Sequence, residues 1–368
     1  MGRSARRTFD LCDVDIVPSR RTRSSKELST AWQLDAYRFE IPLLTHPTDA
    51  IVSPATAIRI GELGGLGVIN AEGLWARHGD AEAMLLRVVR AVEDGQGQAC
   101  LQELHAAPIQ ADLLAASIGA VRDAGVTVAA RVSPQHAEEL TPDLLAAGVE
   151  ILVVQGTIVS AEHVAPPSAR VEPLNLKQFI ADLDVPVVAG GVSDYRTAMH
   201  LMRTGAAGVI VGYGASAVTT TDRVLGIRVP MATALADAAA ARRDYLDETG
   251  GRYVHVIADG GICSAGEIAK AIACGADAVM LGEPLTRARQ APGHGCYWTA
   301  AAAHPSLPRS FISCPGSTES VDIEQLLFGP TSDPSGMYNL FGALRRAMAK
   351  TGYRDLKEFQ KVGLSVRW

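Results

Sequence analysis

The chain has 368 residues, of which 48% are hydrophobic and 20% are charged, and its formal net charge is −6. This composition is typical of a globular protein with a sizeable core. The acidic balance argues against a nucleic-acid-binding protein, which needs a broad basic surface. The sequence contains no run of about 20 apolar residues, so we expect no membrane-spanning segment. The length fits either two ordinary domains or one α/β barrel of about 250 residues with an extension.

The cysteines form no CxxC pair and no CxxC…HxxxH pattern. We therefore expect neither a disulfide framework nor a zinc site, and we expect a reducing, cytoplasmic location. The basic segment Met1–Arg7 is not followed by the apolar stretch of a secretory signal, which agrees with that location. The six cysteines are Cys12, Cys100, Cys263, Cys274, Cys296 and Cys314.

A series of short apolar runs, most of them followed closely by Gly, Asp, Ser, Asn or Thr, is the most informative pattern in the chain. Nearly continuous Val, Ile and Leu runs are typical of strands that are buried on both faces of a parallel sheet. In chain order the predicted strands are Ile41–Thr45, Val68–Asn70, Val126–Val132, Ile151–Gln155, Val185–Ala189, Gly208–Val211, Val254–Ala258 and Ala278–Leu281.

Helical patterns separate these strands, and phrases such as TGAAGV and CGADAV place a glycine between the end of a helix and the next strand. The alternation predicts an α/β fold, a closed (β/α)8 TIM barrel, with an open doubly wound sheet as the alternative. The sequence has no GxGxxG after an early strand and no GxxxxGK[ST], which argues against that alternative. The predicted helices include Ser53–Leu63, Ala111–Ala124, Leu176–Leu183, Tyr195–Thr204, Met231–Asp247, Ser264–Cys274 and Asn339–Lys350.

We expect a single domain over residues 1–368, with a barrel core at about 38–290 and a C-terminal extension with a long active-site flap at about 291–368. The segment Ala76–Gln110, between the second and third strands, is longer than a typical connection and contains a helical pattern. Pro305–Gly336 is rich in Pro, Gly and Ser and is predicted to be a long loop.

In a barrel the chemistry lies at the carboxyl ends of the strands. Asp259, Gly260 and Gly261 follow the seventh strand, and Gly282 follows the eighth, where barrels commonly bind phosphate through backbone N–H groups and a helix N-terminus. Glycine lets an anion approach the backbone closely. The sequence therefore predicts a phosphate site here. The alternative is a tight turn into the next helix, with Asp259 as a turn or capping residue.

The loop after the sixth strand begins with Gly212 and Gly214 and continues with several hydroxyl residues. Such a loop can present carbonyl oxygens to a monovalent cation such as K⁺, or hydroxyl groups to a ligand. The alternative is a turn that only packs. His46, after the first strand, faces the same end of the barrel, where it would bind a ligand, transfer a proton or lie at the surface.

Several phrases carry a resemblance to a known family. IPLLTHPTDA (Ile41–Ala50) and LGGLGVIN (Leu63–Asn70) match its first two strands. VIADGGICSAGEIAKAIACGADAVMLG (Val256–Gly282) is the most specific phrase, because it carries the family's phosphate loops. RTFDLCDVDIVPS and LFGALRRAMAKTGYRDLKEFQ match its opening and C-terminal regions. In these phrases the chain resembles the IMP dehydrogenase/GMP reductase family over nearly its whole length.

The resemblance implies a barrel that binds a purine nucleoside monophosphate or an analogue, uses NAD or NADP at C2 of the base, and assembles as a homo-tetramer. Asp49 matches an aspartate of the family. The segment between the second and third strands is too short for the cystathionine-β-synthase repeats that many IMP dehydrogenases carry. In that respect the chain is similar to GMP reductase and to the insert-free IMP-dehydrogenase-related branch.

The family's nucleophilic cysteine is replaced in this chain. Counted from Gly212 and Gly214, Thr219 stands at the cysteine position of GYGASAVTTT, and Thr221 matches a threonine that assists proton transfer in the family. A threonine hydroxyl is a far weaker nucleophile than a thiolate. Cys263 lies at the same end of the barrel, but it would meet the phosphate, and we expect an inert thiol.

The cofactor side also differs from the family. Gln155 replaces an aspartate that holds a cofactor ribose, Gly191 replaces an asparagine, and Ile210 replaces a basic residue. The flap Gly293–Ser320 has no Arg-Tyr pair of the kind that activates water in IMP dehydrogenase.

Two substitutions concern the phosphate. Ala217 and Glu283 stand where the family has serines that bind it. The Glu283 carboxylate would repel a dianion unless it turns away or is neutralised by Arg287 or Arg289.

Three functions follow as hypotheses. The resemblance favours an NAD(P)-linked oxidoreductase of purine nucleotide metabolism, and the missing thiol is its difficulty. The clustered substitutions favour a catalytically degenerate paralogue that binds a nucleotide or a partner subunit and regulates. A barrel enzyme whose substrate lacks phosphate would suit Glu283, but the sequence offers no catalytic group for it.

Overall fold

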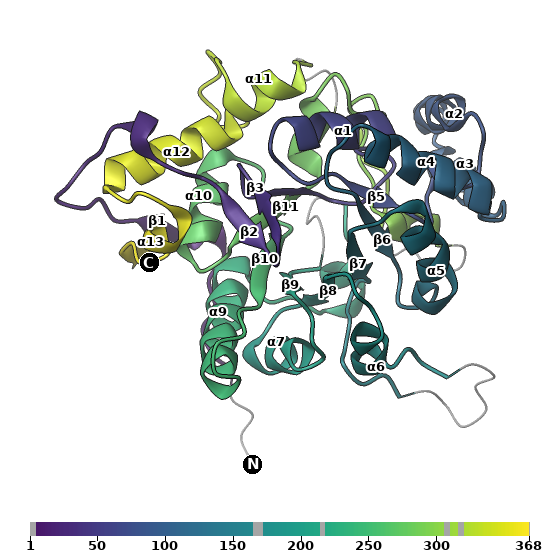
Figure 1. The fold of residues 1–368 in the computed structure, drawn as a ribbon. Coiled ribbons are helices and arrows are strands. Elements are labelled where there is room, and N and C mark those ends of the chain that lie inside the picture. Colours follow the sequence, from purple (N-terminus) through teal and green to yellow (C-terminus); the bar gives the residue numbers. More distant parts are fainter. Residues whose placement is uncertain (1–4, 165–171, 214–217, 305–309, 316–319, 368) are drawn as a thin grey trace.

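A computed structural model describes residues 5–164, 172–213, 218–304, 310–315 and 320–367 of the chain (Figure 1). Eight parallel strands form one sheet in the order β4-β11-β10-β9-β8-β7-β6-β5. A parallel bridge from Leu44 to Leu66, together with the bond from the Thr45 N–H to the Leu66 carbonyl, joins the two edge strands. The sheet is therefore a nearly closed barrel, and the predicted (β/α)8 TIM barrel is confirmed.

All eight predicted strands are present at the predicted places. Their bounds are β4 Leu43–Thr45, β5 Val68–Asn70, β6 Ala129–Val132, β7 Ile151–Gln155, β8 Val187–Val192, β9 Gly208–Val211, β10 His255–Asp259 and β11 Ala278–Leu281. Their residues are almost entirely buried, as the continuous apolar runs indicate.

Helices are arranged around the strands (Figure 1). The predicted ones are found within a few residues of their expected ends, and Ala76–Gln110 contains two helices. The α-helices are α1 Pro54–Glu62, α2 Ala81–Glu93, α3 Gly97–His105, α4 Ala111–Asp123, α5 Ala137–Ala147, α6 Leu176–Ala181, α7 Tyr195–Met202, α8 Thr221–Leu225, α9 Met231–Glu248, α10 Ala265–Ala273, α11 Ile323–Phe328, α12 Leu340–Thr351 and α13 Leu356–Phe359.

Local chemistry explains where these helices begin. Ser53 accepts a hydrogen bond from the Thr56 N–H, and Pro54 occupies the first turn of α1, where its missing N–H has no consequence. Ser264 and Glu267 form a reciprocal capping box that starts α10 immediately after the glycine loop of β10. The backbone of that loop is therefore held at both ends.

Two short antiparallel pairs lie outside the barrel. β1 (Val14–Ile16) pairs with β12 (Leu364–Val366) and ties the two ends of the chain together. β2 (Trp32–Leu34) and β3 (Tyr37–Phe39) form a hairpin near the amino ends of β10 and β11 (Figure 1). The buried apolar side chains of barrel and extension form one continuous cluster. None of the described helices is long and apolar enough to cross a membrane.

The expectation of one long loop over Pro305–Gly336 is wrong in part, because α11 lies within it. Asp322 caps α11 by accepting from the Glu324 N–H, and Ile323, Leu326 and Leu327 are buried against the barrel. The helix has six residues, too few for a helical period to stand out among the surrounding Pro, Gly and Ser.

The expectation that the cysteines form no disulfide is wrong for one pair. Cys296 and Cys314 are bonded, with their Cα atoms 4.1 Å apart. Tyr297 and Ser313, which adjoin these cysteines in the chain, pair in antiparallel fashion and so bring Cys296 and Cys314 together. No sequence motif marks such a pairing, since it depends on how the flap folds back on itself. Cys263 and Cys274 are free.

Candidate active site

The predicted phosphate loops meet at the carboxyl ends of β10 and β11. Asp259 is the last residue of β10, and Gly260 and Gly261 have φ angles of 108° and 67°, the left-handed region that favours glycine. Among the described residues, no group accepts a hydrogen bond from the N–H of Gly260, Gly261 or Ile262. A Cβ added to Gly261 would meet no atom within 4 Å. Consecutive free N–H groups beside open space form an anion-binding concavity.

The space at this loop is small in the structure. A pocket of about 10 Å³ lies between Asp259–Cys263 on one side and Gly282–Pro284 on the other. That volume corresponds to roughly one water molecule. The pocket is therefore smaller than a phosphate group, and its walls would have to separate to admit one.

Asp259 is buried, with 2% of its surface exposed. Its Oδ2 accepts a hydrogen bond of 2.7 Å from the Gln155 side-chain amide and lies 3.7 Å from Nε2 of His46. Burial raises the pKa of Asp259 to about 8 and lowers the pKa of His46 to about 3. At neutral pH the aspartic acid is mostly protonated and the histidine is neutral, so their contact is not an ion pair.

Tyr297 from the flap fills the space beside Gly282. A Cβ on Gly282 would lie 2.2 Å from the tyrosine oxygen, so only glycine fits here. The tyrosine ring contacts the His46 ring edge-on, with centroids 6.3 Å apart. Its hydroxyl is buried without a partner among the described residues, and burial places its pKa well above the usual value. Sequence reasoning missed Tyr297, and the apolar CYW phrase in a polar flap was the available signal.

The threonine that replaces the family's cysteine has a neutral surrounding. The hydroxyls of Thr219 and Thr221 lie 3.1 Å apart, and Thr219 pairs with Ser310 of the flap. Within the described part of the chain, no carboxylate, imidazole or amine is hydrogen-bonded to Thr219. The described residues therefore give Thr219 no hydrogen-bonded base that would activate its hydroxyl. Gly214 and Ala217 lie outside the described residues.

The positions expected to hold a dinucleotide are engaged or closed. The side-chain amide of Gln155 donates to Asp259, and the backbone carbonyl of Gln155 accepts from the Arg131 guanidinium at 2.7 Å. A Cβ on Gly191 would lie 2.0 Å from the Gly212 carbonyl oxygen, and Ile210 is fully buried. Gly191 and Ile210 have no polar side chain, and only the side-chain oxygen of Gln155 is without a described hydrogen bond, so these positions supply little that would hold the ribose or phosphate of NAD or NADP.

Asp49 contacts the loop after β5. Its Oδ2 accepts from the Leu74 N–H at 3.0 Å and lies 3.7 Å from Nε2 of His105. Burial raises the pKa of Asp49 to about 7 and lowers the pKa of His105 to about 4. No described hydrogen bond or ion pair joins Asp49 to Asp259, so the structure does not bring these two predicted residues into contact.

Glu283 lies beside Cys263, whose sulfur is 3.9 Å from Oε2 of the carboxylate. Burial and this carboxylate raise the pKa of Cys263 to about 11, so it remains an unreactive thiol at neutral pH. Among the described residues, no ion pair joins Glu283 to Arg287 or Arg289. Arg287 donates instead to the Met337 sulfur and the Pro284 carbonyl.

The described residues contain no group of three His, Cys, Asp or Glu side chains that would hold a metal ion. Of the two glycines of the predicted cation loop, the structure describes Gly212, whose φ is 112°. A Cβ on Gly212 would lie 2.0 Å from the Asp259 carbonyl oxygen. Gly212 therefore packs directly on the end of β10.

Comparison with known proteins decides the family. The model of the IMP dehydrogenase/GMP reductase domain matches residues 6–304. The chain belongs to the IMP dehydrogenase/GMP reductase family. An uncharacterized oxidoreductase of Mycolicibacterium smegmatis is 66% identical, and the match covers 100% of this chain and 98% of that protein. The inosine-5'-monophosphate dehydrogenase of Aquifex aeolicus is 32% identical over 61% of this chain and 46% of that enzyme.

A solved structure supports the same family. The crystal structure of an IMP dehydrogenase/GMP reductase-like protein from Corynebacterium glutamicum is 54% identical, with a TM-score of 0.94. The match covers 100% of this chain and 96% of that one. The barrel, its extension and the flap region are thus features that this chain shares with a protein of known structure.

Proposed function

We propose that this member of the family binds a purine nucleoside monophosphate or an analogue at the carboxyl end of the barrel. The observation that carries the proposal is the glycine loop after β10, with three consecutive N–H groups that have no acceptor among the described residues. The neighbouring Asp259 is mostly uncharged at neutral pH because burial raises its pKa to about 8. It therefore adds little repulsion to a phosphate at this loop.

The second part of the proposal is that binding occurs without thiol-dependent oxidation, as in a catalytically degenerate, regulatory member of the family. Thr219 has no hydrogen-bonded base among the described residues, and the positions expected to hold NAD or NADP offer few polar side-chain groups to a dinucleotide. Nucleophilic catalysis needs an activated group, and electrostatic positioning alone does not supply one. Nucleotide binding is thus the activity that these residues support.

Titration calorimetry with IMP and with GMP tests the binding. Gly261→Asp places a carboxylate at the anion loop and is expected to weaken affinity by about tenfold or more. Gly261→Asn is the matched control: it has nearly the same shape, is neutral, and like aspartate tolerates a positive φ. It should retain affinity within a few-fold. Absence of binding by the unaltered protein, or equal affinities of the two variants, would refute the proposal.

An NAD(P)-linked oxidoreductase is the second candidate, because the family membership and the relatives named as oxidoreductases favour it. Absorbance of the reduced cofactor, with IMP plus NAD and with GMP plus NADPH, tests it directly. Turnover that depends on Thr221 would support this candidate and overturn the degenerate one. If the unaltered protein is inactive but Thr219→Cys gains turnover, the thiol is the missing part.

The remaining expectations from the family are proposals of the same kind. We propose a homo-tetramer, a cytoplasmic location and a K⁺ ion at the loop of Gly212 and Gly214. Light scattering of the purified protein measures the assembly. Comparison of the melting temperature in KCl and NaCl tests the ion, because an ion that binds only the folded state raises it. A fluorescent fusion reports the location in cells.

A further inference from the structure

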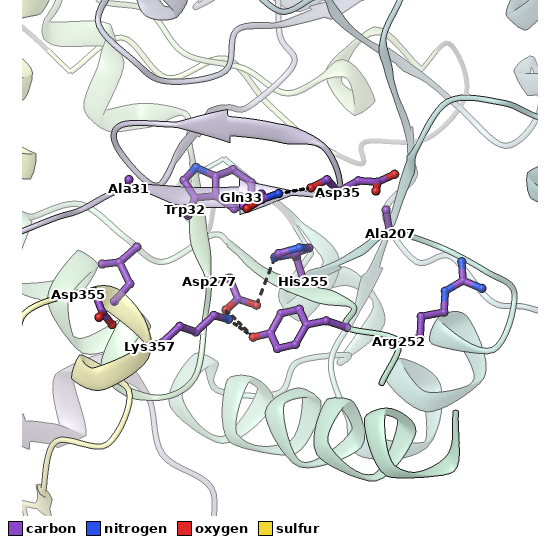
Figure 2. A pocket seen from close by; sticks show the side chains of 12 residues that line it. Ala31, Trp32, Gln33, Asp35, Ala207, Arg252, His255, Asp277, Asp355 and Lys357 are labelled. Carbon is purple, nitrogen blue, oxygen red and sulfur yellow. Dashed lines mark hydrogen bonds and ion pairs between the residues drawn. The ribbon is translucent and has the colours of Figure 1, made fainter. Parts of the chain in front are cut away.

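Figure 2 shows a second cavity. It is lined by His255, the first residue of β10, whereas the glycine loop follows Asp259, the last residue of β10, so the two lie at opposite ends of the barrel. The volume of this second cavity is about 510 Å³, within the range of about 300–1,000 Å³ that is usual for small-molecule sites. Ala207, which precedes β9, and His255, the first residue of β10, form its inner wall. The β2–β3 hairpin and α13 form its outer walls, so three separate parts of the chain meet there.

Three of the residues that line this cavity have aromatic rings. The Trp32 and Tyr253 rings each contact the His255 ring edge-on, with centroids 5.9 Å and 5.0 Å from it, and the Lys357 ammonium lies 3.8 Å from the centroid of the Tyr253 ring. Burial lowers the pKa of His255 to about 4, so the imidazole is neutral and behaves as a third aromatic surface. Flat, partly apolar walls favour a planar aromatic ligand.

The charge on the inner wall is already compensated. Asp277 is buried and accepts hydrogen bonds from Arg242 at 2.7 Å and from the Tyr253 hydroxyl at 2.8 Å, while Lys357 forms an ion pair with it. These two cations hold the pKa of Asp277 well below its usual range, although burial alone would raise it. Asp277 therefore does not require a cationic ligand.

The groups at the rim decide the charge of the ligand. Arg252 donates one N–H to the Gly205 carbonyl, and its remaining side-chain N–H groups have no acceptor among the described residues. Asp35 lies at the same end of the cavity and forms no described ion pair (Figure 2). Lys357, at the other end, keeps one N–H after its bonds to Asp277 and Tyr253. The lining carries two cations (Arg252 and Lys357) and three carboxylates (Asp35, Asp277 and Asp355), and Arg242, which does not line the cavity, pairs with Asp277. The charges are therefore close to balanced, which disfavours a highly charged ligand.

We propose that this cavity binds a planar aromatic monoanion that also carries an N–H donor. The ring lies against the wall formed by Trp32 and His255, the anionic group pairs with Arg252, and the N–H is accepted by Asp35. The ligand contacts barrel, hairpin and C-terminal extension together, so its binding stabilises their mutual packing. This site is independent of the nucleotide site at the other end of the barrel.

Titration calorimetry with three probes tests the proposal. Indoleacetate has the ring, the anion and the N–H; tryptamine has the same ring with a cation; cyclohexaneacetate has the anion without an aromatic ring. Indoleacetate is expected to bind about tenfold or more tightly than either of the others. Tryptamine binding as tightly as indoleacetate, or no binding of indoleacetate at all, would overturn the proposal.

Two variants test whether indoleacetate binds in this cavity. Arg252→Glu reverses the charge at the rim, and Ala207→Trp fills the cavity; each should weaken indoleacetate binding by about tenfold or more. Arg90→Glu, at an exposed position of α2, is the matched control and should leave it unchanged. Circular dichroism and IMP titration verify that each variant is folded. If either variant fails to fold, a crystal structure with indoleacetate decides, because density away from Trp32 and Arg252 overturns the assignment.

Discussion

Replacement of Asp277 by asparagine should destabilise the protein strongly. The carboxylate is 2% exposed, and it accepts hydrogen bonds from Arg242, Lys357, Tyr253, Gln360 and the Val256 N–H. The asparagine side chain would keep the shape but leave the buried guanidinium of Arg242 without its counter-charge. Removal of one partner of a buried ion pair typically costs about 3–5 kcal/mol of the free energy of unfolding.

The expected change in melting temperature follows from the size of the chain. An unfolding entropy of about 2.1 cal/mol/K per residue gives about 0.8 kcal/mol/K for 368 residues. A loss of about 3–5 kcal/mol then lowers the melting temperature by about 4–6 °C, which differential scanning calorimetry resolves. Urea unfolding gives an independent value of the free energy where the transition is reversible.

Glu248→Gln is the matched control for Asp277→Asn. It also removes one carboxylate from an ion pair with arginine, but the side chains of Arg203 and Glu248 are 49% and 45% exposed. Exposed pairs contribute at most about 1 kcal/mol, which corresponds to a shift of roughly 1 °C. If the two variants melt at the same temperature, Asp277 does not compensate a buried charge and the reasoning fails.

Three further changes test other parts of the structure. Because burial raises the pKa of Asp259 from 3.8 to about 8, the folded state binds an extra proton there, and the contribution of Asp259 to the free energy of unfolding should fall as pH rises from about 4 to 8, by at most about 1.4 kcal/mol per pH unit. The buried His46, His105 and His255, whose pKa values are lowered, contribute the opposite slope, so the effect is measured as the difference between the unaltered protein and Asp259→Asn. Asp259→Asn removes this contribution and should be more stable than the unaltered protein at pH above 8. If the free energies of unfolding measured in urea change with pH in parallel for the two proteins, the prediction is wrong. Tyr297→Phe removes a buried hydroxyl without a described partner and should raise the free energy of unfolding by about 1 kcal/mol, so a loss would show that the hydroxyl is satisfied. Cys296→Ser opens a link across 18 residues and should lower stability by about 3 kcal/mol, an effect that reduction of the unaltered protein must reproduce in thermal melts.

The strands could be predicted because burial on both faces of a parallel sheet leaves a direct trace in sequence. The ends of the strands were harder to predict from the sequence. β8 continues to Val192 through Gly190 and Gly191, although a glycine pair is typical of a loop. Here glycine is needed inside the strand, because a Cβ on Gly190 would lie 2.5 Å from the Ile210 carbonyl oxygen. Close approach of two strands, which no local pattern encodes, decides that boundary.

The glycine loop after β10 could be predicted for a similar reason. Asp259, Gly260 and Gly261 are consecutive in sequence, and their position after a strand already places them at the working end of a barrel. The CYW phrase marks Tyr297 as a residue to be buried, but its place beside Gly282 and the Cys296–Cys314 bond could not be predicted, because both depend on the flap folding back over β11. The hydrogen bond from Gln155 to Asp259 joins residues 104 positions apart, so it too arises from barrel closure rather than from local sequence.

Electrostatics links the missing thiol to the other substitutions of the site. Gln155 is neutral, and at neutral pH the pKa values of about 3 for His46 and about 8 for Asp259 leave the imidazole neutral and the carboxyl mostly protonated. A thiolate at position 219 would meet hydroxyls and no cation among the described residues, so its pKa would not be lowered. A phosphate dianion needs only dipoles, and the backbone N–H groups after Asp259 supply them. Under the proposed function, these neutral surroundings favour binding of a nucleotide and supply no charge to a nucleophile at position 219.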